Sequence, residues 1–138
     1  MEKLKYLILI LILVGCVKEE RSFYDYDIEE RIKNLNVNLP EPGEPVANYV
    51  PTVRFSEGSS SYLVYVSGTG PRLENGGYVS GRLGKDMTIE EGYEAAKLVG
   101  INILASLKKE IGDLNKVKRF VKVIGMVNST PDFYQQPA

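Results

Sequence analysis

The sequence contains no histidine and no tryptophan, and it has a single cysteine, Cys16. Histidine is the most common general base and metal ligand in proteins, so zinc hydrolases and Ser/His or Cys/His triads lose their central group here. A single cysteine excludes a disulfide within the chain. The net charge of −1 lacks the basic surplus of a nucleic-acid-binding face. These absences argue against a metalloenzyme and against a nucleic-acid partner.

What is present suffices for one globular domain. The chain has 138 residues, of which 43% are hydrophobic and 25% charged, and a chain of this size can bury a single core. Changes in composition along the chain predict three parts. These are a signal peptide over residues 1–15, a tether over residues 16–45 and the main domain over residues 46–138.

The first sixteen residues, MEKLKYLILILILVGC, have the pattern of a bacterial export signal. Lys3 and Lys5 precede an apolar run, residues 6–14, that is shorter than the roughly 17 to 25 residues of a membrane-spanning helix. The run ends in Leu-Val-Gly before Cys16, which resembles the lipobox of lipoproteins. Lipid on Cys16 and on its freed amino group would anchor the protein to the cell membrane, facing outside the cytoplasm. The alternatives are an uncleaved signal anchor and a mis-assigned start codon before a cytoplasmic protein.

The tether contains two local signals. Residues 27–35 predict a short amphipathic helix in which Asp27 is the N-cap and Ile28, Ile32 and Leu35 share one face. The stretch PEPGEP over residues 40–45 forbids helix and predicts a stiff, extended elbow.

Strands are predicted on both sides of one long helix. Residues 49–55 and 62–68 are rich in β-branched and aromatic residues and are separated by a Gly/Ser turn, which predicts a hairpin. Residues 117–129 follow the helix and are almost continuously apolar from Phe120 to Val127, which predicts a strand buried on both faces and paired along both edges.

The long helix is predicted from Thr88, which forms a capping box with Glu91, to the glycine at position 112. Its apolar stripe is expected to cover the hairpin. The predicted stripe consists of Ala96, Val99, Ile103, Leu107 and Ile111, widened by Tyr93, Leu104 and Ala95.

The segments VANYVPTVR and YVSGTGPRLENGGYVSGRLGKDMTIEEGYEAA resemble the RidA/YjgF family, and the resemblance continues over about residues 40–137. It implies an α+β, chorismate-mutase-like fold that assembles as a homotrimer with ligand clefts between subunits. The implied activity is hydrolysis of reactive enamines and imines, such as 2-aminoacrylate, to a keto acid and ammonia, without a metal or other cofactor. The implied ligand is therefore a small imino or keto acid.

Three ligand-binding residues follow from this resemblance. Tyr49 corresponds to the tyrosine that lines the family's cleft, and Ser67 and Gly68 correspond to its Ser-Gly at the end of the second strand. A hydroxyl and backbone amides there can bind a small carboxylate. The alternatives are that Tyr49 packs on the hairpin and that Gly68 is a bend after a strand. The family usually has glutamine where this chain has Thr69.

The resemblance also predicts missing parts. Relatives continue past the Gln-Pro near the C-terminus with a second helix and two strands, which carry an Ala-Arg-Ser motif and a glutamate. That arginine binds the substrate carboxylate and that glutamate positions the attacking water. Neither has a counterpart in this sequence. Arg54, Arg72, Arg82 and Arg119 are present, but none of these four lies in the matching motif. We therefore expect an interrupted fold and predict no catalytic residue.

The sequence leaves three functions open, and it leaves open whether the chain is an enzyme. The first is a lipid-anchored enamine/imine deaminase. The second is a non-catalytic module that binds a small metabolite or mediates assembly. The third is a truncated fragment of such a lipoprotein, without a function of its own.

Overall fold

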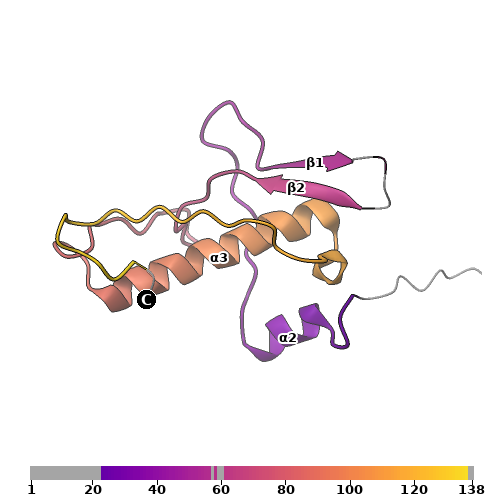
Figure 1. The fold of residues 1–138 in the computed structure, drawn as a ribbon, viewed down its shortest axis with the longest axis horizontal. Helices are drawn as coiled ribbons and strands as arrows, with labels where there is room; N and C mark the ends of the chain where they lie inside the picture. Colours follow the sequence, from indigo (N-terminus) through magenta and orange to yellow (C-terminus); the bar gives the residue numbers. More distant parts are fainter. Residues whose placement is uncertain (1–22, 57, 59–60, 137–138) are drawn as a thin grey trace, which may run out of the picture.

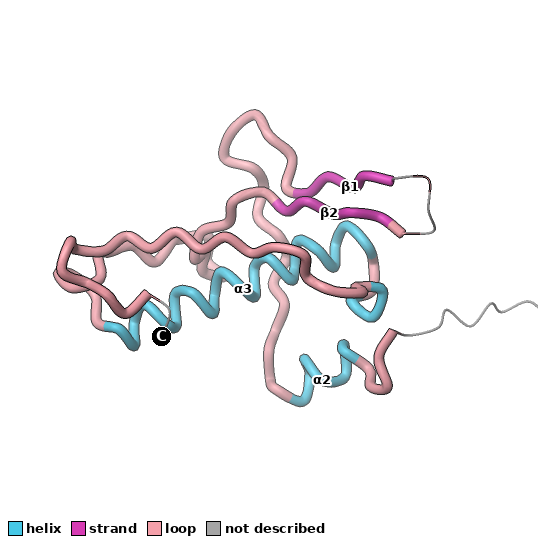
Figure 2. Tube along the Cα trace, in the orientation of Figure 1, coloured by secondary structure: helices cyan, strands magenta, loops and turns pink. Residues whose placement is uncertain are grey.

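The computed structural model describes residues 23–56, 58 and 61–136, so Cys16 and the predicted signal peptide lie outside the described residues. The order of elements is α2 (Ile28–Asn34), β1 (Thr52–Ser56), β2 (Tyr62–Val66), α3 (Ile89–Ile111) and the 3-10 helix η1 (Leu114–Lys116). Figure 1 shows the β1–β2 hairpin over the C-terminal half of α3 and α2 on the opposite side of that helix. Long loops connect these elements (Figure 2). None of the described helices is both long and apolar enough to cross a membrane.

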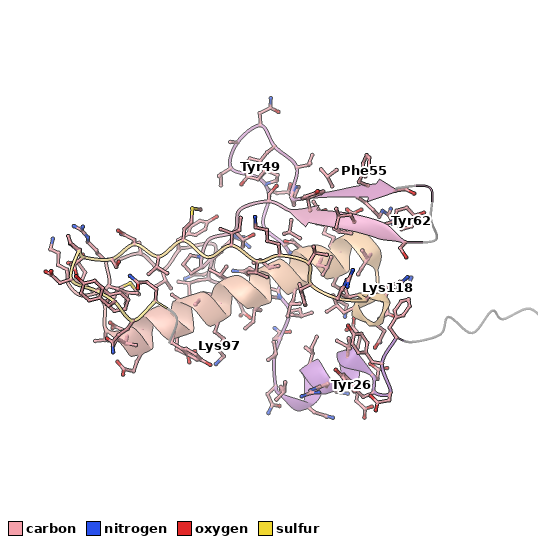
Figure 3. The ribbon with its side chains drawn as sticks, viewed as in Figure 1. Tyr26, Tyr49, Phe55, Tyr62, Lys97 and Lys118 are labelled. Carbon is pink, nitrogen blue, oxygen red and sulfur yellow. The ribbon has the colours of Figure 1, made fainter. Side chains whose placement is uncertain are left out.

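The predicted hairpin is confirmed. β1 and β2 pair antiparallel, in a register that runs from Thr52 opposite Val66 to Ser56 opposite Tyr62. The hairpin is fastened to the last turns of α3 through Glu110, whose carboxylate accepts a hydrogen bond from Thr52 Oγ1 at 2.8 Å and pairs with Arg54 Nε at 3.3 Å. Phe55 projects from the other face, and both Phe55 and Tyr62, whose ring lies under the Arg54 guanidinium, are exposed (Figure 3).

The bounds predicted for the long helix are also confirmed. Thr88 Oγ1 accepts a hydrogen bond from the Glu91 N–H at 3.2 Å, and Glu91 Oε2 accepts one from the Thr88 N–H at 2.8 Å, which completes the capping box. Gly112 ends the helix with φ of +82°, a left-handed conformation that favours glycine.

The predicted apolar stripe of α3 is wrong in part. Ala96 and Tyr93 are exposed, whereas the buried positions of α3 are Asn102, Ala105 and Leu107. The covered face is therefore rotated relative to the prediction. The reason is a tertiary contact: the side chain of Asn102 donates to a backbone carbonyl of the loop after β2, so a polar residue occupies the inner face.

The small core lies where α3, η1 and α2 meet. Among the described residues, the buried apolar side chains are Leu114, Ala105 and Leu107. Glu29 of α2 accepts a hydrogen bond from the Leu114 N–H at 3.1 Å and forms an ion pair with Lys108. The helix predicted within the tether therefore forms and packs against the end of α3.

The N-terminal end of α2 contributes to this attachment. Asp27 caps the helix by accepting from the Glu30 N–H at 3.0 Å, as predicted. Asn115 of η1 accepts from the Ile28 N–H at 2.8 Å and donates to Asp27 at 3.2 Å. These contacts place α2 across the C-terminal end of α3.

The strand predicted over residues 117–129 is not formed. The segment is extended and exposed, with Val121, Val123, Ile124 and Met126 each more than 70% exposed. Its ends are attached: Lys118 Nζ donates to Ser61 Oγ at 2.5 Å, and Leu83 and Ser129 form a parallel bridge. Between these points, its backbone N–H groups donate to no other backbone group of the described residues. An apolar run without paired neighbours along its edges does not become a strand.

Candidate functional site

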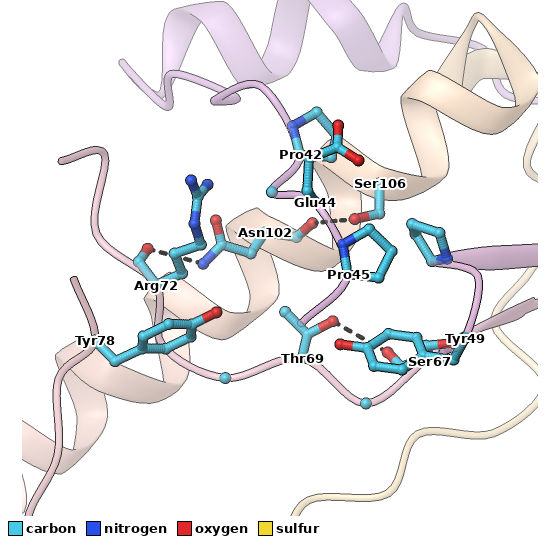
Figure 4. Close-up of a pocket in the computed structure, with 14 residues that line it drawn as sticks. Pro42, Glu44, Pro45, Tyr49, Ser67, Thr69, Arg72, Tyr78, Asn102 and Ser106 are labelled. Carbon is cyan, nitrogen blue, oxygen red and sulfur yellow. Dashed lines mark hydrogen bonds between the residues drawn. The ribbon is translucent and has the colours of Figure 1, made fainter. Parts of the chain in front are cut away.

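A cavity of about 80 Å³ lies between the proline-rich elbow, the loop that follows β2 and the middle of α3 (Figure 4). Each wall comes from a different part of the sequence, so tertiary folding alone creates it. The lining residues are Pro42, Gly43, Glu44, Pro45, Tyr49, Pro51, Ser67, Gly68, Thr69, Gly70, Arg72, Tyr78, Asn102 and Ser106.

The structure brings the three predicted ligand-binding residues together in this cavity. Tyr49 and Ser67 lie on one side of it (Figure 4). Ser67 Oγ donates a hydrogen bond to the Val50 carbonyl at 2.6 Å, so this hydroxyl connects the residue after the end of β2 to the segment just before β1. No atom lies within 4 Å of a Cβ built on Gly68, so close packing is not what requires glycine there. Binding of a ligand by these residues remains a prediction.

Thr69, at the position where the family usually has glutamine, also lines the cavity. Its Oγ1 donates to the Ser67 carbonyl at 3.1 Å. The hydroxyl therefore shapes the bend after β2.

Sequence reasoning missed the elbow as part of the site, because prolines and glutamates between two elements are typical of a linker. Pro42, Gly43, Glu44 and Pro45 in fact form one wall. A Cβ added to Gly43 would lie 2.9 Å from both Cζ and Nε of Arg72. The glycine therefore lets the guanidinium lie against the elbow backbone. A glycine inside an otherwise proline-rich spacer was the available signal for a close approach.

Arg72, Asn102 and Ser106 were also missed as site residues. Asn102 is 8% exposed and donates from Nδ2 to the Arg72 backbone carbonyl at 3.0 Å. Ser106 Oγ donates to the Asn102 carbonyl at 3.0 Å. The loop around Arg72 is thereby attached to α3, as Figure 4 shows. A lone asparagine on an apolar helix face was the only sequence signal.

The cavity contains one cationic and one acidic side chain, Arg72 and Glu44, together with the phenols of Tyr49 and Tyr78. Arg72 and Glu44 do not form an ion pair with each other, and the guanidinium makes no ion pair with any described acidic residue. Its positive charge therefore remains available to an anionic ligand. Within the described ranges, no group of three or more Cys, Asp or Glu residues is placed to bind a metal ion.

A second, wider depression of about 730 Å³ lies beside α2. Its lining includes the ion pair between Glu29 and Lys108, which attaches α2 to α3. Those charges already have a structural role, so we place the candidate site in the smaller cavity.

Comparison with known proteins gives a consistent family. The model of the family described as "YjgF/chorismate mutase-like, putative endoribonuclease" matches residues 29–137. A Trypanosoma cruzi protein named Protein TCP17 is 34% identical over 109 residues, which are 79% of this chain and 65% of that protein.

Two solved structures are similar. The Agrobacterium tumefaciens protein Atu1372, described as of unknown function, matches with a TM-score of 0.65 and 40% identity over 80% of this chain and 64% of its own. A Shewanella oneidensis protein described as a putative endoribonuclease matches with a TM-score of 0.58 and 34% identity, over 68% of this chain and 59% of its own. The chain thus spans less than two thirds of the length of each of these relatives.

Proposed function

Because the chain belongs to the YjgF/chorismate mutase-like family, we propose that its cavity binds a small 2-imino acid and hydrolyses it to a keto acid and ammonia. The observation that carries this proposal is the convergence of Tyr49, Ser67 and Gly68 in one small cavity that also contains a cation and a carboxylate. A site of this kind suits a reactive enamine or imine such as 2-aminoacrylate in its imine form, because that reaction needs only orientation and proton transfer.

Glu44 is the group best placed to move the proton. Water adds to the imine carbon and gives a proton to the Glu44 carboxylate. That proton then passes to the nitrogen and gives a carbinolamine. The same carboxylate next carries the proton of the carbinolamine hydroxyl to the nitrogen, so the carbon–nitrogen bond breaks and ammonia leaves as the carbonyl forms. One imine and one water thus become one keto acid and one ammonia. In this scheme the backbone amides near Gly68 orient the substrate, and Glu44 is the only acidic side chain in the cavity lining.

The test is ammonia release by the full chain, purified in mild detergent, from an imino acid generated in the same vessel by a serine dehydratase. We expect a rate above buffer, and a loss of at least tenfold in Glu44→Gln, since general base catalysis contributes roughly 10²- to 10⁴-fold. Glu41→Gln is the matched control, because this elbow glutamate does not line the cavity. A wild-type rate equal to buffer would remove the proposal.

The alternative is a binding module that takes up the same small acids without turnover. This alternative is favoured because the Ser67 hydroxyl already donates a hydrogen bond to the Val50 carbonyl. Glu44 is then the one carboxylate in the cavity lining that can accept a proton, beside the phenols of Tyr49 and Tyr78. Binding of a keto acid with no ammonia release from the imine would select this alternative.

We also propose that copies of this chain associate as a homotrimer. Supporting this, the apolar side chains of residues 120–127 are exposed in the single chain, and burial of such a surface drives association. Light scattering on the detergent-solubilised chain, corrected for detergent, is expected to give three times the monomer mass. A monomeric mass would contradict the assembly.

Attachment to the membrane through Cys16 is a further part of the proposal, supported by the lipobox-like sequence that ends at this residue. Bacterial cells that express the chain are expected to incorporate labelled palmitate into it, and Cys16→Ser is expected to abolish this. Unchanged labelling of the variant would refute the anchor.

A further inference from the structure

We propose that Arg72 is the residue that binds the carboxylate of the ligand in this cavity. This inference rests on the proposed function, because it concerns the same cavity and the same small acids. Arg72 was not selected from the sequence, since it lies outside the arginine motif of the resembling family. Its place in the folded chain is what singles it out.

The charge of Arg72 is available to a ligand. The described acidic residues include Glu44, which lines the same cavity, yet no ion pair joins it or any other of them to the guanidinium. Figure 4 shows the two charged side chains on separate walls, both extending toward the top of the view. A guanidinium presents a planar fork of N–H donors that matches both oxygens of a carboxylate.

The backbone of Arg72 is held from two sides. Asn102 donates to its carbonyl from α3, and Arg72 forms an antiparallel bridge with Tyr78 across the turn at residues 73–77. Leu73 N–H donates to the Gly77 carbonyl at 2.8 Å within that turn. A donor on a backbone that is already ordered loses less conformational entropy when it binds.

Gly43 determines where the guanidinium lies. A Cβ added there would lie 2.9 Å from both Cζ and Nε of Arg72, so the side chain of any other residue would compete with the guanidinium for this space. Gly43 is not among the positive-φ glycines, so alanine is tolerated by the backbone itself. Gly43→Ala is therefore a way to displace the guanidinium without removing it.

The size of the cavity limits the ligand. Its volume of about 80 Å³ holds about six water-sized centres, if each takes roughly 10 to 15 Å³. A keto acid such as pyruvate has that many non-hydrogen atoms, whereas a nucleotide is several times larger. The enclosed volume is therefore sufficient for a small carboxylate such as pyruvate.

The experiment measures binding of pyruvate to the full chain in mild detergent by calorimetry. Arg72→Met, which keeps the apolar stem and removes the charge, is expected to weaken binding by roughly 10- to 100-fold, the usual range for a hydrogen bond to a charged group. Arg72→Lys is expected to retain part of the affinity, and Gly43→Ala to weaken binding with Arg72 still present. Glu44→Gln is expected to strengthen binding, because it removes a negative charge from the lining, although it lowers ammonia release.

Arg119→Met is the matched control, because Arg119 is an exposed arginine outside the cavity. Denaturation of each variant checks the fold, and Arg72→Met keeps the Asn102 hydrogen bond because the acceptor is the backbone carbonyl. The inference is overturned if the wild-type chain binds no pyruvate, if Arg72→Met binds it as well as wild type, or if Arg119→Met loses as much affinity.

Two further probes separate the sources of the anion and the two proposals. Inorganic phosphate that competes as well as pyruvate, or RNA cleavage that depends on Arg72, would overturn the assignment to a small carboxylate. Binding of pyruvate that depends on Arg72, without ammonia release by the wild-type chain, would refute the deaminase and support the inference.

Discussion

Replacing Asn102 with leucine tests whether one buried amide holds the cavity together. Asn102 lies on the inner face of α3, is 8% exposed, and donates from Nδ2 to the Arg72 carbonyl at 3.0 Å. Leucine has nearly the same volume but no donor. Asn102→Leu therefore leaves the Arg72 carbonyl without its partner and releases the loop from the helix.

The expected cost follows from the two consequences of this change. A net hydrogen bond of about 1 kcal/mol is lost, and a part-buried carbonyl loses its partner, which adds about 1 kcal/mol, so we expect the free energy of unfolding to fall by about 2 kcal/mol. Ser106→Ala is the control, since the Ser106 hydroxyl donates to a helix carbonyl at 3.0 Å from the same wall. Such back-bonding contributes little, so we expect a change within about 0.5 kcal/mol.

Urea denaturation of the full chain gives both numbers, with far-UV circular dichroism and the fluorescence of its nine tyrosines as signals. The reasoning is refuted if Asn102→Leu is as stable as wild type, or if Ser106→Ala costs as much.

Three further predictions concern packing and helix ends. Leu114→Ala should lower the free energy of unfolding by about 3 kcal/mol, because Leu114 is 2% exposed. Leu35→Ala is the control, because Leu35 is 66% exposed, and it should change this free energy by less than about 0.5 kcal/mol. Equal effects of the two substitutions in urea denaturation would contradict the assignment of Leu114 to the core. Thr88→Ala should cost about 1 kcal/mol through loss of the capping box, with fraying of the first turn of α3 in hydrogen exchange, and unchanged exchange there would count against it. The hydrogen bond that Asp27 accepts from the Glu30 N–H lowers the pKa of Asp27 below its ordinary value of 3.8, and the hydrogen bond from Asn115 lowers it further. The cap therefore stabilises α2 fully above pH 3.8, and this stabilisation is lost as the pH falls through the lower pKa of the folded state. Asp27→Asn should remove this acid dependence of α2 protection, and a pH profile identical to wild type would show that the cap does not titrate.

Local rules predicted the helices well. The N-caps Asp27 and Thr88 and the glycine at the end of α3 act within one or two turns, so the residues that decide the structure are neighbours in the sequence. The hairpin was predictable for the same reason, because its two strands are close together in the sequence.

Features that depend on distant partners were not predictable. Residues 117–129 have the composition of a central strand, but a strand exists only where a neighbour accepts its hydrogen bonds, and the described part of the chain supplies none along most of this segment. The buried position of Asn102 depends on a carbonyl thirty residues earlier. Neither fact is encoded in the local pattern.

The candidate site was predictable only in part, for a related reason. Tyr49, Ser67 and Gly68 were found through resemblance, and the structure places them in one cavity. Arg72 and Gly43 were missed because each looks ordinary by itself. Their significance is a contact between a proline-rich spacer and a turn, which the sequence pattern does not reveal.

The end of α3 ties down the chain on both sides of the cavity wall. Lys108 pairs with Glu29 before the elbow, and Glu110 binds Thr52 and Arg54 after it. The chain between these attachments is a closed loop whose two ends rest on one turn of the helix, at positions two residues apart, with the wall near its middle. If either attachment breaks, the loop gains conformational entropy, and a smaller fraction of its conformations places the wall where it can contact a ligand. The coupling is reciprocal: if an intact attachment favours ligand binding by a given free energy, then bound ligand stabilises that attachment by the same free energy.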